Sequence, residues 1–224
     1  PFVWNNQSNP YDNRDPRMKY TIVCNEMKWP VDPVEIWEGG TNGLPLQNAT
    51  TTGYYLKKYV NNTISFEAGS TVTKKQHNWV LFRYGEILLN YAEAMINAFH
   101  DPNYKDAVYN MSAREAVNQI RGRTNISLPG FPSDITEKDF VKRLKNERRV
   151  ELAFEGHRFW DVRRWKELGQ TANIYGVKIT KNNEVISYEK FLLETRAVTD
   201  NMYFYPIPNT ERFKNPNLGQ NPGW

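Results

Sequence analysis

The sequence contains a single cysteine, Cys24, and only three histidines in 224 residues. One cysteine cannot form a disulfide within the chain, so we expect a small buried thiol and draw nothing from it about compartment. No apolar run approaches the ~20 residues that a membrane-spanning helix needs. The sequence also has no His-Glu-x-x-His zinc motif, no phosphate-binding glycine loop and no nucleophile elbow. We therefore expect no metal, no cofactor and no catalytic residue.

The charge is mildly basic and evenly mixed, with a formal net charge of +4 and 24% charged residues. A nucleic-acid-binding surface gathers Lys and Arg on one face. Here acids interrupt the basic residues almost everywhere, and Glu147 breaks even the densest basic run, at 142–149. We expect no nucleic-acid partner. With 39% hydrophobic residues, the composition is that of an ordinary globular domain.

The pattern along the chain changes twice. Residues 1–78 are rich in Asn, Pro, Gly and Thr, with strand-like pieces at 20–23 and 54–60. Residues 79–168 show helical periodicity. Residues 169–224 form a tail that we expect to be irregular or weakly β, because its prolines favour extended structure.

Three helices are predicted in the middle of the chain, and a fourth at about 158–168. The first carries a three- and four-residue apolar repeat that begins at 79 and ends at Phe99. Ser112 and Glu115 have the spacing of a capping box, and Thr136 with Asp139 marks the start of the third helix. Gly156 is expected to interrupt that helix. Small residues on the first two helices permit the close approach of a tetratricopeptide-type hairpin, although only one copy is visible.

The run ERRVELAFEGHRFWDVRRW at 147–165 combines acids, arginines and large aromatics at helical spacing. Glu147, Glu151 and Glu155 fall on one helix face. We expect them to form a buried ion network with nearby arginines (Arg148, Arg158, Arg163, Arg164), since an unpaired buried charge costs several kcal/mol. A glycosidase pair is the alternative. Arginines would lower the carboxyl pKa and spoil a general acid, so the alternative is weaker.

Eight motifs occur in an order that resembles one known family. They are RDPR at 14–17, TGYYLKKY at 52–59, FRYGEILLNYAEA at 82–94, VNQIRGR at 117–123, the run at 147–165, YPIP at 205–208, NPNL at 215–218 and QNPG at 220–223. Together they resemble the SusD/RagB family of outer-membrane nutrient-binding lipoproteins. Each motif is weak alone, whereas their joint order is highly specific.

The resemblance implies a mainly α fold, with a tetratricopeptide-like helical body, long irregular loops and little β structure. Family members are longer, so residues 1–224 are interpreted as a C-terminal portion. Such proteins sit in the cell outer membrane as surface-exposed lipoproteins, held by a lipid anchor that this chain lacks. They capture oligosaccharides or polysaccharides, in some relatives peptides, and deliver them to a SusC-like TonB-dependent transporter without catalysis.

The tryptophans divide into two groups. Trp160 and Trp165 lie on predicted helices and are interpreted as core residues. Trp29 and Trp37 lie in a loop segment that the family motifs cover least, beside Glu35 and Asn42, and Trp4 lies in the preceding loop. Indole rings pack against the flat faces of sugars, whose hydroxyls need amide or carboxylate partners. We therefore predict a glycan site formed by Trp4, Trp29, Trp37, Glu35 and Asn42. The alternative is that these loop tryptophans anchor the loops to the core.

Two other functions remain open from the sequence. One is a tetratricopeptide-like scaffold that binds protein through a helical face and has no ligand site of its own. The other, weaker one is a glycan-active hydrolase. The sequence does not indicate which glycan binds, or whether the ligand is a peptide.

Overall fold

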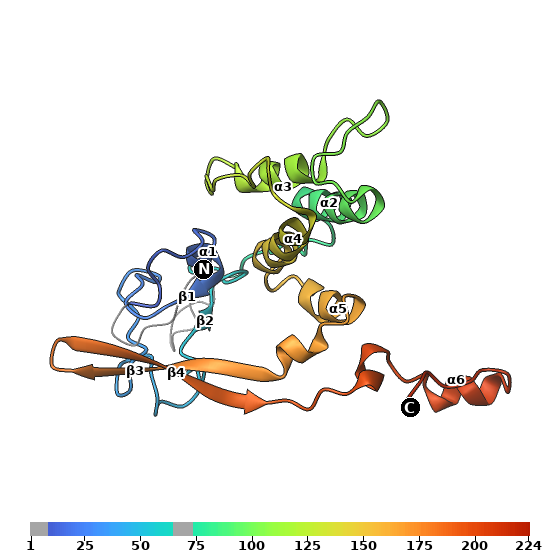
Figure 1. Ribbon diagram of the computed structural model, residues 1–224. Helices are drawn as coiled ribbons and strands as arrows, with labels where there is room; N and C mark the ends of the chain where they lie inside the picture. Colours follow the sequence, from blue (N-terminus) through green and yellow to red (C-terminus); the bar gives the residue numbers. More distant parts are fainter. Residues whose placement is uncertain (1–8, 65–73) are drawn as a thin grey trace. The chain divides into compact units, whose positions relative to one another are not determined.

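The computed structural model describes residues 9–64 and 74–224. The helices are Met18–Thr21 (α1), Tyr84–Phe99 (α2), Ala113–Arg121 (α3), Glu137–Glu151 (α4), His157–Arg164 (α5) and Asn209–Lys214 (α6), with 3-10 turns at Leu168–Thr171 and Asp200–Tyr203 (Figure 1). The strands are Ile22–Val23 (β1), Tyr55–Leu56 (β2), Asn173–Asn182 (β3) and Val185–Thr195 (β4). The predicted mainly α class, with long loops and two small antiparallel sheets, is confirmed. Within the described residues, none of these helices has the length and apolarity to span a membrane.

The chain forms two compact units. The helical unit comprises Asp15–Thr21 and Asn61–His157. The loop-and-hairpin unit comprises Pro1–Arg14, Ile22–Val60 and Arg158–Trp224. Each unit has its own hydrophobic core.

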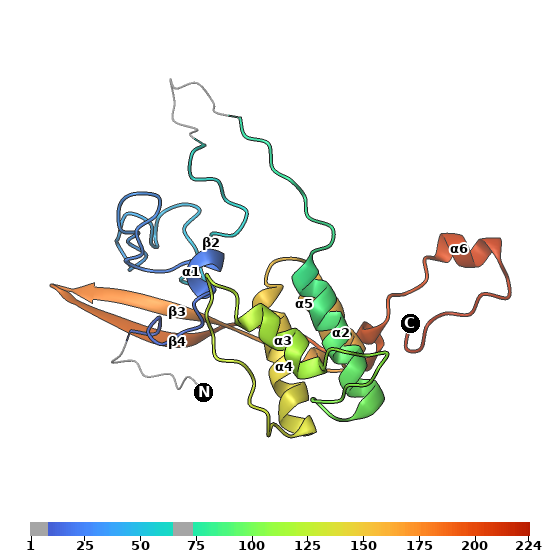
Figure 2. The ribbon, with the colours of Figure 1, turned by 90° about the horizontal axis from the view of Figure 1, so that it is seen from above.

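In the helical unit, α2 packs against both α3 and α4 (Figure 2). Ala92 on α2 and Ala113 and Ala116 on α3 are fully buried, so the predicted close approach of these two helices is confirmed. Ser112 and Glu115 form the expected capping box, and Thr136 caps α4 by accepting a hydrogen bond from the Asp139 amide. The remaining core consists of large apolar side chains, among them Leu88, Leu89, Ile96, Val117, Ile120, Phe140 and Leu144.

The first helix starts later than its apolar repeat predicts. Arg83 has extended backbone angles and occupies the N-cap position, so α2 begins at Tyr84 and not near 79. Leu81, which lies within the apolar repeat, is 74% exposed. The guanidinium of Arg83 explains the late start, because it binds the carboxylates of Glu151 and Glu155 and the Glu151 carbonyl.

The acids of α4 lie in a buried ion network, as predicted, but their arginine partners come from other segments. Glu147 pairs with Arg17, just before α1, at 2.5 Å and with Arg121, at the end of α3, at 2.6 Å. Its two carboxylate oxygens therefore tie α4 to two segments that are distant in the sequence.

Glu151 is almost completely buried, with a side chain only 3% exposed. Its carboxylate pairs with Arg17 at 2.8 Å, Arg83 at 2.7 Å and Arg123 at 2.8 Å. Burial raises the pKa of Glu151, but hydrogen bonds from Arg83 and Arg17 and the charge of Arg123 outweigh it, so the pKa lies below its usual value. The partners of Glu147 and Glu151 are thus not the arginines of their own run, and the prediction is wrong for these two acids.

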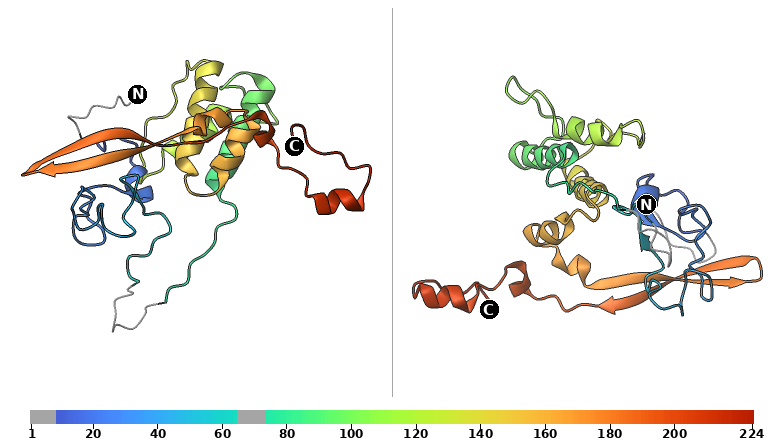
Figure 3. Two further views of the ribbon diagram at one scale, coloured as in Figure 1. Left: turned by 90° about the horizontal axis from the view of Figure 1, so that it is seen from below. Right: turned by 180° about the vertical axis from the view of Figure 1, so that it is seen from behind.

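The loop-and-hairpin unit contains a long antiparallel hairpin where the sequence predicted an irregular or weakly β segment (Figure 3). β3 and β4 pair from Asn173 opposite Thr195 to Asn182 opposite Val185, with one irregularity at Ile174 and Tyr175. The turn is closed by Asn183, whose φ is 54°, and asparagine tolerates this left-handed conformation better than most residues. The predicted short strands are found as β1 and β2, which pair with each other.

The second core joins the loops of residues 22–60 to this hairpin. Val23 and Ile36 from the loops pack with Val177 and Ile179 of β3 and Tyr188 of β4. Buried Asn25 accepts a hydrogen bond from the Ile36 amide at 2.8 Å and contacts the Tyr188 hydroxyl at 3.5 Å. Cys24 is buried in the same region, as expected, and burial raises the pKa of its thiol to about 11.

Replacing Glu151 by Gln should destabilise the helical unit by roughly 3–5 kcal/mol, because Arg17 then loses one of the carboxylates that compensate its burial. Chemical denaturation followed by far-ultraviolet circular dichroism measures the loss. Glu137→Gln is the matched control on the same helix, since Glu137 is exposed and pairs with exposed His100; its effect should stay below about 1 kcal/mol. Equal effects of the two changes would contradict the structural role of the network.

Acid should weaken the helical unit. The pKa values of Glu151 and Asp15 are both lowered in the folded state. Each carboxylate therefore stabilises the fold above its unfolded pKa, and that stability is lost as the pH falls through the lowered value. Urea midpoints should be level between pH 7 and about 5 and fall below that. In Glu151→Gln the fall of the urea midpoint below about pH 5 should be shallower. The same pH dependence in both proteins would show that Glu151 does not cause the loss of stability in acid.

Candidate functional site

The loop of residues 36–53 is attached to the free edge of β3 by main-chain hydrogen bonds. The Val177 amide donates to the Thr52 carbonyl at 2.9 Å, and the Glu38 amide donates to the Ile179 carbonyl at 2.9 Å. Gly53 has a φ of +79°, and a Cβ there would lie 2.4 Å from the Val177 carbonyl oxygen. Only glycine can occupy position 53 at this distance from β3, so Gly53 permits the close contact between the loop and the strand.

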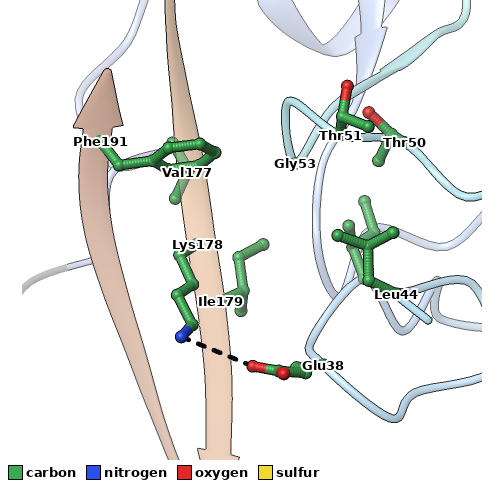
Figure 4. Close-up of a pocket in the computed structure, with 10 residues that line it drawn as sticks. Glu38, Leu44, Thr50, Thr51, Gly53, Val177, Lys178, Ile179 and Phe191 are labelled. Carbon is green, nitrogen blue, oxygen red and sulfur yellow. Dashed lines mark ion pairs between the residues drawn. The ribbon is translucent and has the colours of Figure 1, made fainter. Parts of the chain in front are cut away.

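A cavity of about 280 Å³ lies at this attachment (Figure 4). One wall is the hairpin, with Val177 and Ile179 on β3 and Phe191 on β4. The facing wall is the loop, with Leu44, Thr50, Thr51 and Gly53. Ile36, Glu38 and Lys178 complete the lining. We call this cavity the hairpin pocket.

The polar groups of the hairpin pocket are few. Glu38 and Lys178 form an exposed ion pair at 3.7 Å, which contributes little to stability and so leaves both groups available to a ligand. Thr50 bonds to Thr52, whereas the Thr51 hydroxyl makes no hydrogen bond within the described chain. Such a mostly apolar cavity with a few convergent polar groups is the usual form of a small-molecule site.

A family model described as the SusD family matches residues 5–224. The chain belongs to the SusD family. The resemblance inferred from the eight ordered motifs is thereby confirmed.

Individual SusD-like proteins match as well. SusD-like protein P2 of Formosa agariphila is 29% identical over 163 residues, which is 70% of this chain and 28% of P2. SusD-like protein P38 of the same organism is 37% identical over 150 residues, or 64% of this chain and 24% of P38. The crystal structure of a SusD-like protein from Bacteroides fragilis superposes with a TM-score of 0.77 at 27% identity, covering 96% of this chain and 40% of that one. This SusD-family chain therefore spans well under half the length of these relatives.

Trp29 and Trp37 do not line the hairpin pocket. Ile36 and Glu38, the neighbours of Trp37, do line it. Trp29 and Trp37 are half-buried against the second core. The ammonium groups of Lys57 and Lys181 lie 4.6 Å and 4.5 Å from the centres of the Trp29 and Trp37 rings, respectively. A sugar that stacks on the lysine-covered face of either indole must displace the lysine or bind to it. Trp4 lies outside the described residues.

The two predicted polar residues shape the loop. Asn42 accepts hydrogen bonds from the Glu35 amide at 3.1 Å and the Thr41 hydroxyl at 3.2 Å. Glu35 accepts one from the Thr41 amide at 3.2 Å. The side-chain nitrogen of Asn42 donates to no described residue and remains available. The structure thus brings Glu35, Asn42 and Trp37 together on one turn, with Trp29 on the same core.

Trp160 is not a core residue, contrary to the sequence prediction. It is 57% exposed and packs edge-on against Phe159, with ring centres 5.0 Å apart. Tyr205 lies 6.0 Å from both rings, and Arg163 covers the face of Phe159 at 3.5 Å. Helical spacing did not reveal this exposed aromatic cluster, because Phe159 and Trp160 are adjacent and α5 is only eight residues long. It provides a second aromatic surface in the loop-and-hairpin unit.

Replacing Gly53 by Ala should detach the loop from β3, because the new Cβ collides with the Val177 carbonyl as well as straining a positive φ. We expect a loss of roughly 2 kcal/mol or more and faster proteolysis within 36–53. Gly39→Ala is the control. Gly39 has a φ of +87° but nothing within 4 Å, so only the backbone strain of about 1 kcal/mol applies. Equal losses in the two variants would mean that the close approach is unimportant.

Proposed function

We propose that this chain forms part of a cell-surface nutrient-binding protein that captures oligosaccharides or polysaccharides without transforming them. Membership of the SusD family carries the proposal, since SusD-like proteins are in general glycan-binding proteins of nutrient uptake. The hairpin pocket and the neighbouring indoles supply the kind of surface that this role needs. The protein would be held in the outer membrane as a lipoprotein and would pass its ligand to a SusC-like TonB-dependent transporter.

The chemistry of the acids supports binding over hydrolysis. A glycosidase needs two carboxyl groups about 5–10 Å apart, one of them protonated near neutral pH. The acids of the 147–165 run are instead neutralised by arginines, and the pKa of Glu151 is lowered, the wrong direction for a general acid. In the hairpin pocket Glu38 is the acid among the lining residues, and Lys178 pairs with it.

The proposed ligand contacts combine the predicted residues with the pocket. Trp29 and Trp37 are half-buried indoles, with Lys57 and Lys181 as hydrogen-bond donors above the rings. Asn42 offers its amide nitrogen, and Glu35 lies on the same turn. Charged and amide groups beside apolar faces suit sugars, which present hydroxyls at their rims and C–H groups on their faces.

A protein-binding scaffold is the second candidate, and one observation favours it. Leu81, Phe82, Tyr84 and Ile87 are all at least half exposed, at the start of α2 in the helical unit. Contiguous exposed apolar side chains often mark protein interfaces. A chain that retains no glycan but whose Phe82→Ser variant loses a transporter partner would fit this reading.

Affinity gel electrophoresis against a panel of polysaccharides tests the glycan site. The substitutions Trp29→Ala and Trp37→Ala should each weaken retention by roughly 5- to 30-fold, corresponding to ~1–2 kcal/mol for one stacked ring. Trp160→Ala removes an exposed indole from the same unit and is the matched control. Circular dichroism checks folding, and Trp29→Phe should restore part of the retention. Full retention by folded Trp29→Ala and Trp37→Ala proteins would sink this assignment.

A further inference from the structure

The lining of the hairpin pocket separates into an apolar interior and a polar rim. Apolar side chains come from both walls: Leu44 from the loop, Val177 and Ile179 from β3, and Phe191 from β4 (Figure 4). The charged groups of Glu38 and Lys178 bond to each other and are more than half exposed. The pocket thus presents an apolar wall and a solvent-exposed polar rim close enough together for one sugar ring to contact both.

The apolar interior discriminates against fully hydroxylated sugars. A hydroxyl pressed against Leu44, Val177 and Phe191 finds no hydrogen-bond partner, and leaving a polar group unpaired costs about 1–3 kcal/mol. A methyl group at the same place gains about 0.8 kcal/mol from burial. The lining therefore favours a sugar whose ring carries an apolar substituent.

The charge of the pocket rim and the volume of the pocket further limit which sugars can bind. Glu38 and Lys178 neutralise each other, so the rim gives no net attraction to a uronate or a sulfated sugar. A volume of about 280 Å³ lies at the low end of the roughly 300–1,000 Å³ typical of ligand sites. One sugar ring, at a chain end or a branch, fits this volume better than the middle of a long chain.

We propose that the hairpin pocket binds a single sugar ring that carries a methyl group, an inference that rests on the proposed glycan-binding function. The methyl belongs to a 6-deoxyhexose or to the acetamido group of an N-acetylhexosamine. It packs against Leu44, Val177 and Phe191. The ring hydroxyls face Thr51 and the Glu38–Lys178 pair.

Two pairs of monosaccharides differ by a methyl-bearing group. L-fucose is L-galactose without one hydroxyl, and N-acetylglucosamine is glucose with an acetamido substituent. Titration calorimetry on the full-length protein should give at least fivefold tighter binding for one methyl-bearing member than for its partner. The pair that discriminates tells which source of the methyl is used. Equal affinities within both pairs would overturn the proposal.

Substitutions in the loop test whether the pocket makes the discrimination. Leu44→Gln should abolish the preference within the discriminating pair. Leu46→Gln should leave the preference intact, since Leu46 lies on the same loop, is 49% exposed against 46% for Leu44, and does not line the pocket. Both residues are exposed enough for the fold to tolerate the change. A Leu44→Gln protein that keeps the preference would refute the role of the pocket.

Further outcomes separate this proposal from the proposed function. Glu38→Gln should weaken both members of the discriminating pair alike and leave their ratio unchanged, because it alters the rim and not the interior. Retention of polysaccharides without monosaccharide discrimination would reject the methyl-binding pocket and leave glycan capture standing. An absence of binding to any glycan would reject both.

Discussion

Two main-chain hydrogen bonds at the edge of β3 position the loop that forms one wall of the hairpin pocket. The loop of residues 36–53 has no helix or strand of its own. It is held where the Thr52 carbonyl and the Glu38 amide bind Val177 and Ile179, and where Gly53 lets its backbone touch the strand. Because the attachment is made by backbone groups, side chains between the attached points remain free to line a pocket. The hairpin is thus the rigid support, and the loop supplies the variable chemistry.

The helical unit is organised by a different constraint, the pairing of buried charge. Glu147 and Glu151 of α4 form ion pairs with Arg17, Arg83 and Arg121, which lie on three other segments. Removing one partner would leave an uncompensated buried charge, so the segments are held in one arrangement even though such pairs add little net stability. The acid-rich signature is therefore architectural. Because arginines occupy its carboxylates, we place the proposed ligand recognition in the loop-and-hairpin unit.

The parts of the fold that local rules govern were predictable. Two helix starts could be predicted from Ser112, Glu115 and Thr136, because helix capping depends on residues that are close in sequence. The β3–β4 hairpin was missed, since its turn at Asn183 lacks the Asn-Gly signal and its strands carry many polar residues on their exposed faces. The late start of α2 was also missed, because the side chain of Arg83 binds acids about 70 residues away in the sequence.

The ligand-binding role of the predicted site residues stays a prediction, and the sequence alone did not indicate the hairpin pocket. The segment around Trp29, Trp37, Glu35 and Asn42 does adjoin the pocket, but the lining depends on Val177 and Phe191, more than 120 residues further along the chain. Sequence spacing also cannot tell that Arg17 would reach Glu147, 130 residues away. Long-range pairings of this kind need the tertiary fold.

The most direct measurement is a crystal structure of the full-length protein with an oligosaccharide that ends in a methyl-bearing sugar. The account predicts density for that terminal ring between β3 and the loop, with its methyl on Leu44 and Phe191. A well-ordered ring stacked instead on Trp160 and Tyr205, with the hairpin pocket holding only water, would contradict it.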